Sequence, residues 1–349
     1  PDMVCPLEWD IVDEATEAAF GYGSNLYTIW AMDGYGYVLF PNTPAGERFN
    51  GGRKAAKAAD INLIDVLDEN QGIVHVIAPE LGIALPGLSI VCPDSHTCSL
   101  GALGAMAWGI GSSDAEHAMA TGCLRVKKPP QMRITVDGEL GAGITAKDLA
   151  LHIIATLGAS GAKRCAVEYA GSAIRALSIE ERLTLCNMAV EFSAFSGLVA
   201  PDAKAIAYIN GREYAPKGEL WQQAVAFWQS LFSDEQAQFD KTIEIDCADI
   251  SPTITWGNSP QHACSVNSLV PSAQAGATQN QIKALKRAYE YMDVQPGTAL
   301  KGLPIGAAFI GSCTNSRISD LRLAAKVLKG RKVADNVNAI CVPGSTTVK

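Results

Sequence analysis

The sequence predicts an α/β protein whose mostly parallel sheets present polar side chains at the ends of their strands. Three observations support this class. Apolar, β-branched runs alternate with segments of helical period over most of the 349 residues. Several of these runs stop at Gly, Pro, Ser or Asp, which end strands and cap helices. A hydrophobic content of 48% with 18% charged residues is ordinary for a globular protein with a sizeable core.

Composition and charge exclude several classes of protein. A formal net charge of -8 argues against sequence-independent nucleic-acid binding, which needs clustered Lys and Arg. No run of about 20 apolar residues is present for a membrane helix, and the acidic start lacks the basic flank of a signal peptide. The ten cysteines contain no C-x-x-C pair and suit reduced thiols. We therefore expect a soluble, cytoplasmic chain with no membrane and no nucleic-acid partner.

The first 130 residues hold the densest group of reactive side chains. Residues 1–50 have no clear period, and 53–66 combine a helix signal with an apolar run. The segment 71–82 is predicted to contain a short strand with His75 inside it. A histidine within an apolar strand is usually a hydrogen-bonded core residue, but the proximity of Asp94 in the sequence favours a functional role.

A buried strand is predicted at 85–91, and Pro93 ends it. Asp94, Ser95 and His96 then lie at the carboxyl end of this strand. Ligands of open α/β sheets bind outside such strand ends. The glycines that follow are small enough to let backbone or an anionic ligand approach closely. The sequence therefore places a candidate site here.

The middle of the chain predicts a compact α/β unit. A basic, proline-containing break at 127–130 suggests a domain boundary before it. The expected elements are a strand at 132–140, a helix opening on Thr145, a strand at 163–171 and a helix with a Ser178–Glu181 capping box. An amphipathic segment and further strand character follow, and a second boundary is predicted near residue 256.

The last part predicts a helix at 279–292 and a buried strand at 305–312, with another helix beginning near residues 318–320. Cys313 falls between that strand and that helix, a position that favours a thiolate. A single cysteine is more often an inert buried thiol. The polar Thr-Asn-Ser run that follows makes burial in a purely apolar core a poorer fit.

Several long strings resemble the aconitase superfamily, and within it the isopropylmalate dehydratase branch. They are PDSHTCSLGALGAMAWGIGSSDAEHAMAT, GITAKDL, LTLCNMAVEF, GLVAPD and FIGSCTNSRISDLR. The similarity covers the chain from about Gly51 in a consistent order. It implies aconitase-like three-layer α/β/α domains with mixed or parallel sheets. The expected domains are 1–127, 128–256 and 257–349, the third being incomplete.

The resemblance implies a hydro-lyase and isomerase that moves a hydroxyl between neighbouring carbons of a hydroxy-dicarboxylate through an alkene. In leucine biosynthesis such an enzyme interconverts 2- and 3-isopropylmalate. The family holds a [4Fe-4S] cluster by three cysteine thiolates, and the open iron acts as a Lewis acid. By resemblance, the catalytic residues are His75, Asp94, His96 and Glu168, the substrate-binding residues are Ser95, Asn315 and Asp33, and the cluster ligand is Cys313.

The resemblance also implies further cluster ligands and a partner subunit. The other two cluster cysteines form a C-x-x-C motif downstream in the family, and the sequence stops at Lys349 before one appears. We therefore expect a large, catalytic subunit in a fragmentary or shortened form, with one of its three cluster ligands. A separate small subunit with a swivelling domain is expected as the partner.

Two other interpretations remain open on the sequence alone. A non-catalytic relative of the same fold would serve as a scaffold or binding module without a cluster. An unrelated small-molecule enzyme would use Asp94 and His96, or a zinc site built from Cys92, His96 and Cys98. The spacing of this last set is unlike that of paired zinc motifs, and a fourth ligand is missing.

Overall fold

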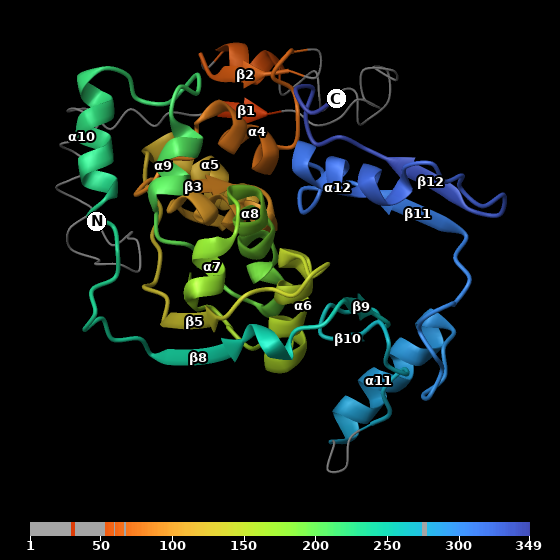
Figure 1. The fold of residues 1–349 in the computed structure, drawn as a ribbon. Helices are drawn as coiled ribbons and strands as arrows, with labels where there is room; N and C mark the ends of the chain where they lie inside the picture. Colours follow the sequence, from red (N-terminus) through yellow and green to blue (C-terminus); the bar gives the residue numbers. More distant parts are fainter. Residues whose placement is uncertain (1–28, 32–52, 59, 66–67, 274–277) are drawn as a thin grey trace.

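The computed structural model describes residues 29–31, 53–58, 60–65, 68–273 and 278–349. Short strands and helices alternate within these ranges, which confirms the predicted α/β class (Figure 1). None of the described helices is long and apolar enough to cross a membrane.

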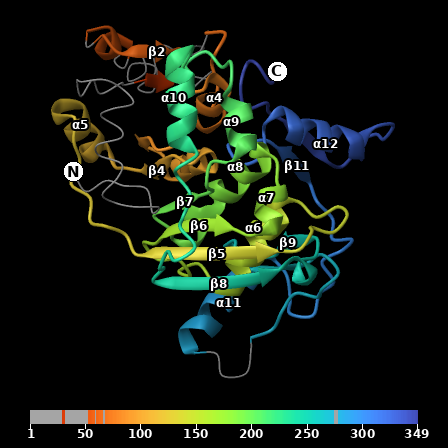
Figure 2. The ribbon, with the colours of Figure 1, turned by 60° about the vertical axis from the view of Figure 1, so that its left-hand side comes forward.

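A four-stranded parallel sheet, in the order β7-β6-β5-β8, forms the middle of the fold (Figure 2). Its strands are β5 (Gln131–Asp137), β6 (Ala166–Ala170), β7 (Ser196–Leu198) and β8 (Lys241–Asp246). Every second residue of β5 is buried, as expected for a strand with one face toward the core. Parallel neighbours need crossover connections, and helices provide them here.

Three helices lie beside this sheet, and α6 and α8 among them begin where the sequence predicts. They are α6 (Ala146–Leu157), α7 (Ser172–Ala176) and α8 (Ile179–Asn187), the last continuing into the 3₁₀ helix η2 (Met188–Phe192). Thr145 caps α6 and Ser178 caps α8, each through a reciprocal capping box. α7 packs on β5 and β6, while α8 packs on α6 and β7. The ends of α8 and η2 are thereby fixed relative to the sheet.

A second parallel pair, β3 (Ser89–Cys92) and β4 (Met106–Gly109), lies on the other side of α8. The long 3₁₀ helix η1 (Ser95–Leu103) connects the two strands and packs against α8 and β7. A Cβ at Gly101 would lie 1.8 Å from the carbonyl oxygen of Gly197, so only glycine allows this approach. Helix α5 (Ser112–Thr121) follows β4, and β1 (Ile29–Ala31) pairs with β2 (Asn62–Ile64).

One continuous hydrophobic core contains residues from Ala78 to Ile250. It includes side chains on both sides of the boundary predicted at residue 127. The first two domains therefore share a core in this structure, and the proposed boundaries stay predictions.

The strand predicted around His75 is wrong, because this segment is the helix α4 (Val74–Leu81). A short apolar run does not distinguish a strand from a buried helix by its pattern. Gly82, with φ 75°, ends the helix in the left-handed conformation. Five of its eight residues besides His75 are buried, so tertiary packing decides the conformation.

The last part of the chain forms two smaller units. The first contains the antiparallel pair β9 (Thr253–Thr255) and β10 (Ala263–Ser265), which follows the short 3₁₀ helix η3 (Cys247–Asp249), and α11 (Gln279–Met292), the helix predicted at those residues. It has a small core of its own around Trp256 and Ala288.

The second unit pairs β11 (Ala307–Ile310) in parallel with β12 (Asn338–Cys341), joined through α12 (Ile318–Leu328). β11 is a strand as predicted, but the prediction that it is buried is wrong. Phe309 is 62% exposed and Ile340 is 57% exposed. Among the described strands β11 pairs with β12 alone, which leaves part of this small sheet uncovered.

Candidate active site at the carboxyl end of β3

Asp94 lies just beyond the end of β3, where it caps η1. Its Oδ1 accepts a hydrogen bond from the backbone N–H of His96 at 2.7 Å. Its carbonyl oxygen accepts one from the Thr97 hydroxyl at 2.6 Å. A Cβ at Gly109 would lie 2.6 Å from the Asp94 carbonyl oxygen, so glycine lets β4 pass close to this turn. The carboxylate is therefore held at the strand end that the sequence indicates.

Two histidines flank this carboxylate. The distance from Asp94 Oδ1 to His75 Nε2 is 3.9 Å, and to His96 Nδ1 it is 3.6 Å. His75 belongs to the first turn of α4 and is only 1% exposed. Neither ring nitrogen of His75 has a hydrogen-bond partner among the described residues. The structure thus brings together the three side chains that the sequence singles out in this region.

Glu191, in η2, completes this group, although the sequence analysis assigns it no role. Its Oε1 lies 3.1 Å from His96 Nε2. The hydrogen bond to Glu191 raises the pKa of His96 against the opposing effect of burial, and the same contact lowers the pKa of Glu191. Glu191 stands within the LTLCNMAVEF string, but no periodicity there shows which way its side chain points. The packing of α8 on η1 decides that direction.

The pKa of His75 moves the opposite way. Burial lowers it to about 4, although the charge of Asp94 opposes this effect. Near neutral pH, His75 is therefore neutral, whereas the charged form of His96 is favoured more than in an ordinary histidine. Titratable neighbours whose pKa values are pushed apart are typical of sites that transfer protons.

Cys313 lies in the turn after β11 and connects with this group through Asn187. The Asn187 side-chain N–H₂ donates to Cys313 Sγ at 3.3 Å and to Ser99 Oγ at 2.8 Å. The Ser99 hydroxyl in turn donates to the carbonyl oxygen of His96 at 2.6 Å. Asn187 is fully buried at the end of α8, and no pattern in the sequence indicates its role. The two motifs that the sequence places more than 200 residues apart are thus linked by one amide.

Arg317 holds the turn that carries Cys313. Its guanidinium donates to the carbonyl oxygens of Thr314 at 2.9 Å and Cys313 at 3.1 Å. Burial lowers the pKa of Arg317, and Asp320 opposes this effect from 3.7 Å. Asn315 donates to Asp320 at 2.9 Å, so its amide helps to fix the start of α12. The substrate-binding role given to Asn315 stays a prediction.

Glu168 lies in a different environment on β6. Its Oε2 accepts a hydrogen bond from the Ser233 hydroxyl, and Arg133 Nη2 lies 3.5 Å from its Oε1. Burial raises the pKa of Glu168, with Ser233 and Arg133 opposing. None of its described contacts connects it with Asp94 or the histidines. Its catalytic role stays a prediction, and Asp33 falls outside the described residues.

A cleft of about 420 Å³ opens beside Asp94 and Ser95. The Ser95 hydroxyl, 3.4 Å from His96 Nδ1, lies at the edge of this cleft. The other walls come from the end of β4 and from the loop between η2 and β7, and include Trp108 and Phe195. Its volume is within the range of small-molecule sites, about 300–1,000 Å³.

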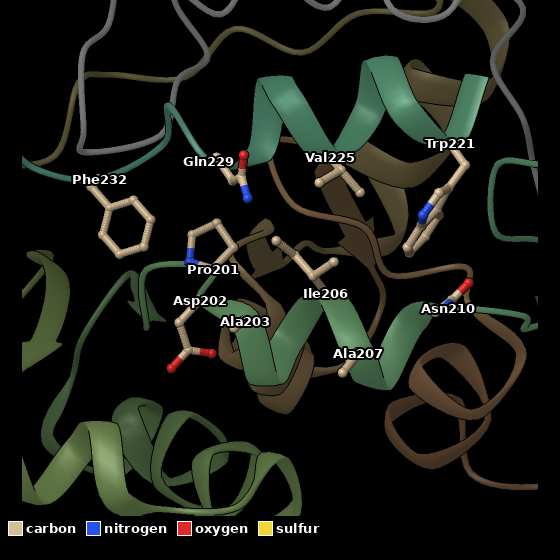
Figure 3. Close-up of a pocket in the computed structure, with 10 residues that line it drawn as sticks. All are labelled: Pro201, Asp202, Ala203, Ile206, Ala207, Asn210, Trp221, Val225, Gln229 and Phe232. Carbon is tan, nitrogen blue, oxygen red and sulfur yellow. The ribbon is translucent and has the colours of Figure 1, made fainter. Parts of the chain in front are cut away.

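A larger cavity of about 490 Å³ lies between α9 (Ala203–Ile209) and α10 (Glu219–Trp228) (Figure 3). Its walls are mainly apolar, with Trp221 and Val225 of α10 facing Ile206 of α9 across it. None of the site residues described above lines it. The chemistry and not the cavity size therefore locates the candidate site.

No group of three His, Cys, Asp or Glu side chains within the described ranges could hold a metal ion. A [4Fe-4S] cluster needs three thiolates, so Cys313 fits one ligand position and the described residues do not complete the site. The hypothesis of a zinc site on Cys92, His96 and Cys98 is wrong, because these side chains do not form a group that could hold a metal ion. Burial also raises the pKa of Cys98 to about 12, which disfavours a thiolate ligand.

Comparison with known proteins identifies the family of this chain. Residues 43–349 match the model of the aconitase family (aconitate hydratase). The chain is 51% identical over 297 residues to the 3-isopropylmalate dehydratase large subunit 1 of Bradyrhizobium diazoefficiens. That alignment covers 85% of this chain and 62% of the relative, so the chain spans less than two thirds of the relative's length. The family match extends over most of the sequence, and the chain therefore belongs to the aconitase family.

Proposed function

We propose that this chain is the large subunit of a hydro-lyase that interconverts 2- and 3-isopropylmalate by dehydration and rehydration. Support comes from the family and from the similarity to a protein named 3-isopropylmalate dehydratase large subunit. The observation that carries the proposal is the position of Asp94 between two imidazoles with oppositely shifted pKa values.

The proposed role of His96 is to supply a proton to the departing hydroxyl. Its Nε2 is hydrogen-bonded to Glu191, and its Nδ1 faces Asp94 and Ser95. The charged ring can therefore release a proton from Nδ1, and Asp94 orients it. Glu191 stabilises the charged form before the transfer and favours its recovery afterwards. Over the full isomerisation water is removed and added back, so no net proton is consumed.

We also propose Cys313 as one ligand of a [4Fe-4S] cluster, since enzymes of this family generally use one. The N–H···S hydrogen bond from Asn187 suits a thiolate at this position. The described residues supply one thiolate, so the role of His96 above is derived without the cluster. A small subunit is the proposed partner, because the relative is named as a large subunit.

The test is to express a complete large subunit that contains this sequence together with a small subunit, reconstitute the complex anaerobically with iron and sulfide, and supply 2-isopropylmalate. We expect formation of 3-isopropylmalate and ultraviolet absorbance from the alkene, with kcat falling about 100-fold or more in His96→Asn. We also expect iron content and visible absorbance to fall in Cys313→Ser. A folded, iron-free chain that still binds the small subunit without turnover would support the scaffold alternative instead.

A further inference from the structure

The cleft beside Asp94 has an unpaired cation on its wall. Arg164 lines it, and no hydrogen bond or ion pair to its guanidinium is found in the part of the chain that the structure describes. Asp94 and Ser95 line the same cleft. The cleft therefore offers a positive group, a carboxylate and a hydroxyl to one bound molecule.

The remaining wall is aromatic. The rings of Trp108 and Phe195 stack with their centroids 5.3 Å apart and an interplanar angle of 28°. Ile110 and Val190 extend this apolar wall. Burying an aliphatic group here would contribute roughly 25 cal/mol for each Å² of apolar surface removed from water. The cleft thus combines an anion site with an apolar site.

The backbone of Arg164 has an unusual conformation. Arg164 has φ 61° and Ser193 has φ 69°, and both line the cleft. The N–H of Arg164 donates to the carbonyl oxygen of Ser193 at 2.8 Å, so the two turns support each other. Glycine suits such a φ better than arginine does. Backbone strain of this kind is often found at functional positions, so the strained φ of Arg164 favours a use for its side chain.

We infer that Arg164 binds a carboxylate of a branched hydroxy-dicarboxylate in this cleft, while the Trp108–Phe195 wall binds its aliphatic branch. The hydroxyl of the ligand then lies toward Asp94 and Ser95, where a carboxylate can accept its hydrogen bond. Arg164 is in this case a substrate-binding residue, and the Trp108–Phe195 wall determines which substrate is preferred. This inference rests on the proposed function, because it names the part of the cleft that selects the substrate.

The test is isothermal titration calorimetry on the full 349-residue chain with 2-isopropylmalate and, separately, with malate, which lacks the branch. We expect Arg164→Gly to weaken binding of both ligands about 10-fold or more, since bonds to charged groups are the strong ones. Its melting temperature should not fall, because glycine relieves the backbone conformation. Phe195→Ala should weaken 2-isopropylmalate binding severalfold and leave malate binding nearly unchanged.

Lys163→Gln is the matched control, because Lys163 is the exposed neighbouring cation and does not line the cleft. It should bind both ligands as the unsubstituted chain does. The inference is overturned if the unsubstituted chain binds neither ligand, or if Arg164→Gly binds both as tightly as Lys163→Gln. It is also overturned if Phe195→Ala weakens both ligands equally.

Calorimetry needs neither iron nor turnover, so its outcome is independent of the activity assay. Binding through Arg164 without isomerisation would remove the proposed function and leave this subsite in place. Isomerisation with unchanged binding in Arg164→Gly would do the reverse.

Discussion

Asp94 is the residue at which the two imidazoles of the site meet. His75 and His96 are both within 4 Å of its Oδ1, yet the pKa of one falls and that of the other rises. Burial dominates for His75, and the hydrogen bond that His96 donates to Glu191 dominates for His96. Environment, and not residue type, therefore divides the two roles.

We expect the low pKa of His75 to reduce the free energy of unfolding as the pH falls. At pH values above 6.5 its ring is neutral in both the folded and unfolded states. Between pH 6.5 and about 4 the unfolded chain binds a proton that the folded chain does not, so stability is lost on acidification. The loss is on the order of 3 kcal/mol and levels off below pH 4. Urea denaturation across this range measures it.

His75→Asn should flatten this acid limb, whatever its effect on stability at neutral pH. His117→Gln is the control, because His117 is exposed on α5 and should leave the slope unchanged. His96 acts in the opposite direction, since its raised pKa gives stability that is present below pH 6.5 and lost as the pH rises. Equal acid slopes in His75→Asn and the unsubstituted chain would contradict the burial argument.

Glu191→Gln should bring the pKa of His96 back toward its ordinary value, because the amide no longer holds the charged ring. Measurement of the His96 ring resonances by NMR against pH follows this change. Glu168→Gln is the matched control, since Glu168 contacts Ser233 and Arg133 and not His96. A shift in Glu168→Gln and none in Glu191→Gln would reverse the assignment.

Site residues next to strand ends could be located from the sequence, whereas Asn187 and Glu191 could not. Asp94, His96 and Cys313 follow apolar strands, so their positions at sheet edges were predictable. Asn187 and Glu191 lie in a capped helix and its 3₁₀ continuation, where the orientation depends on contacts with η1. Such long-range packing leaves no local pattern.

At the scale of elements, the contact of η1 with β7 sets the position of the site. η1 starts with the turn that holds Asp94, and it lies so close to β7 that Gly101 has no space for a side chain. The capping boxes of α6 and α8 were readable from the sequence because they involve residues three apart. The helical conformation of α4 was not readable from the sequence, because it depends on packing against residues that are distant in the sequence.

Gly101→Ala should lower the free energy of unfolding by about 3 kcal/mol or more, since backbone must move to admit the methyl group. We expect the His75 and His96 resonances to shift as well, because η1 moves. Gly111→Ala is the control, with nothing within 4 Å of the added Cβ, and should cost less than about 1 kcal/mol. Similar losses in both variants, measured by urea denaturation, would contradict the close contact.

The parts of the molecule differ in how deeply their apolar side chains are buried. The central sheet is covered by a continuous core, whereas β11 and β12 expose Phe309 and Ile340. Regions with few buried apolar contacts open locally at low free energy. We expect backbone amides of β11 and β12 to exchange with deuterium about tenfold or more faster than those of β5, in native-state exchange read by mass spectrometry. Equal protection would indicate that this unit unfolds only with the whole.

The N-terminal end of α4 is held by hydrogen bonds to residues that are distant in the sequence. Ile73 N–H donates to the carbonyl oxygen of Gly344 at 2.8 Å, and Thr346 reaches Gln71 across 275 positions. Contacts of such separation carry a large loop-closure entropy and form late in folding. On a ribosome, Gly344 emerges only after nearly all the other described residues. We therefore expect His75 to reach its buried, neutral position late in folding, so that Asp94 first has only His96 beside it.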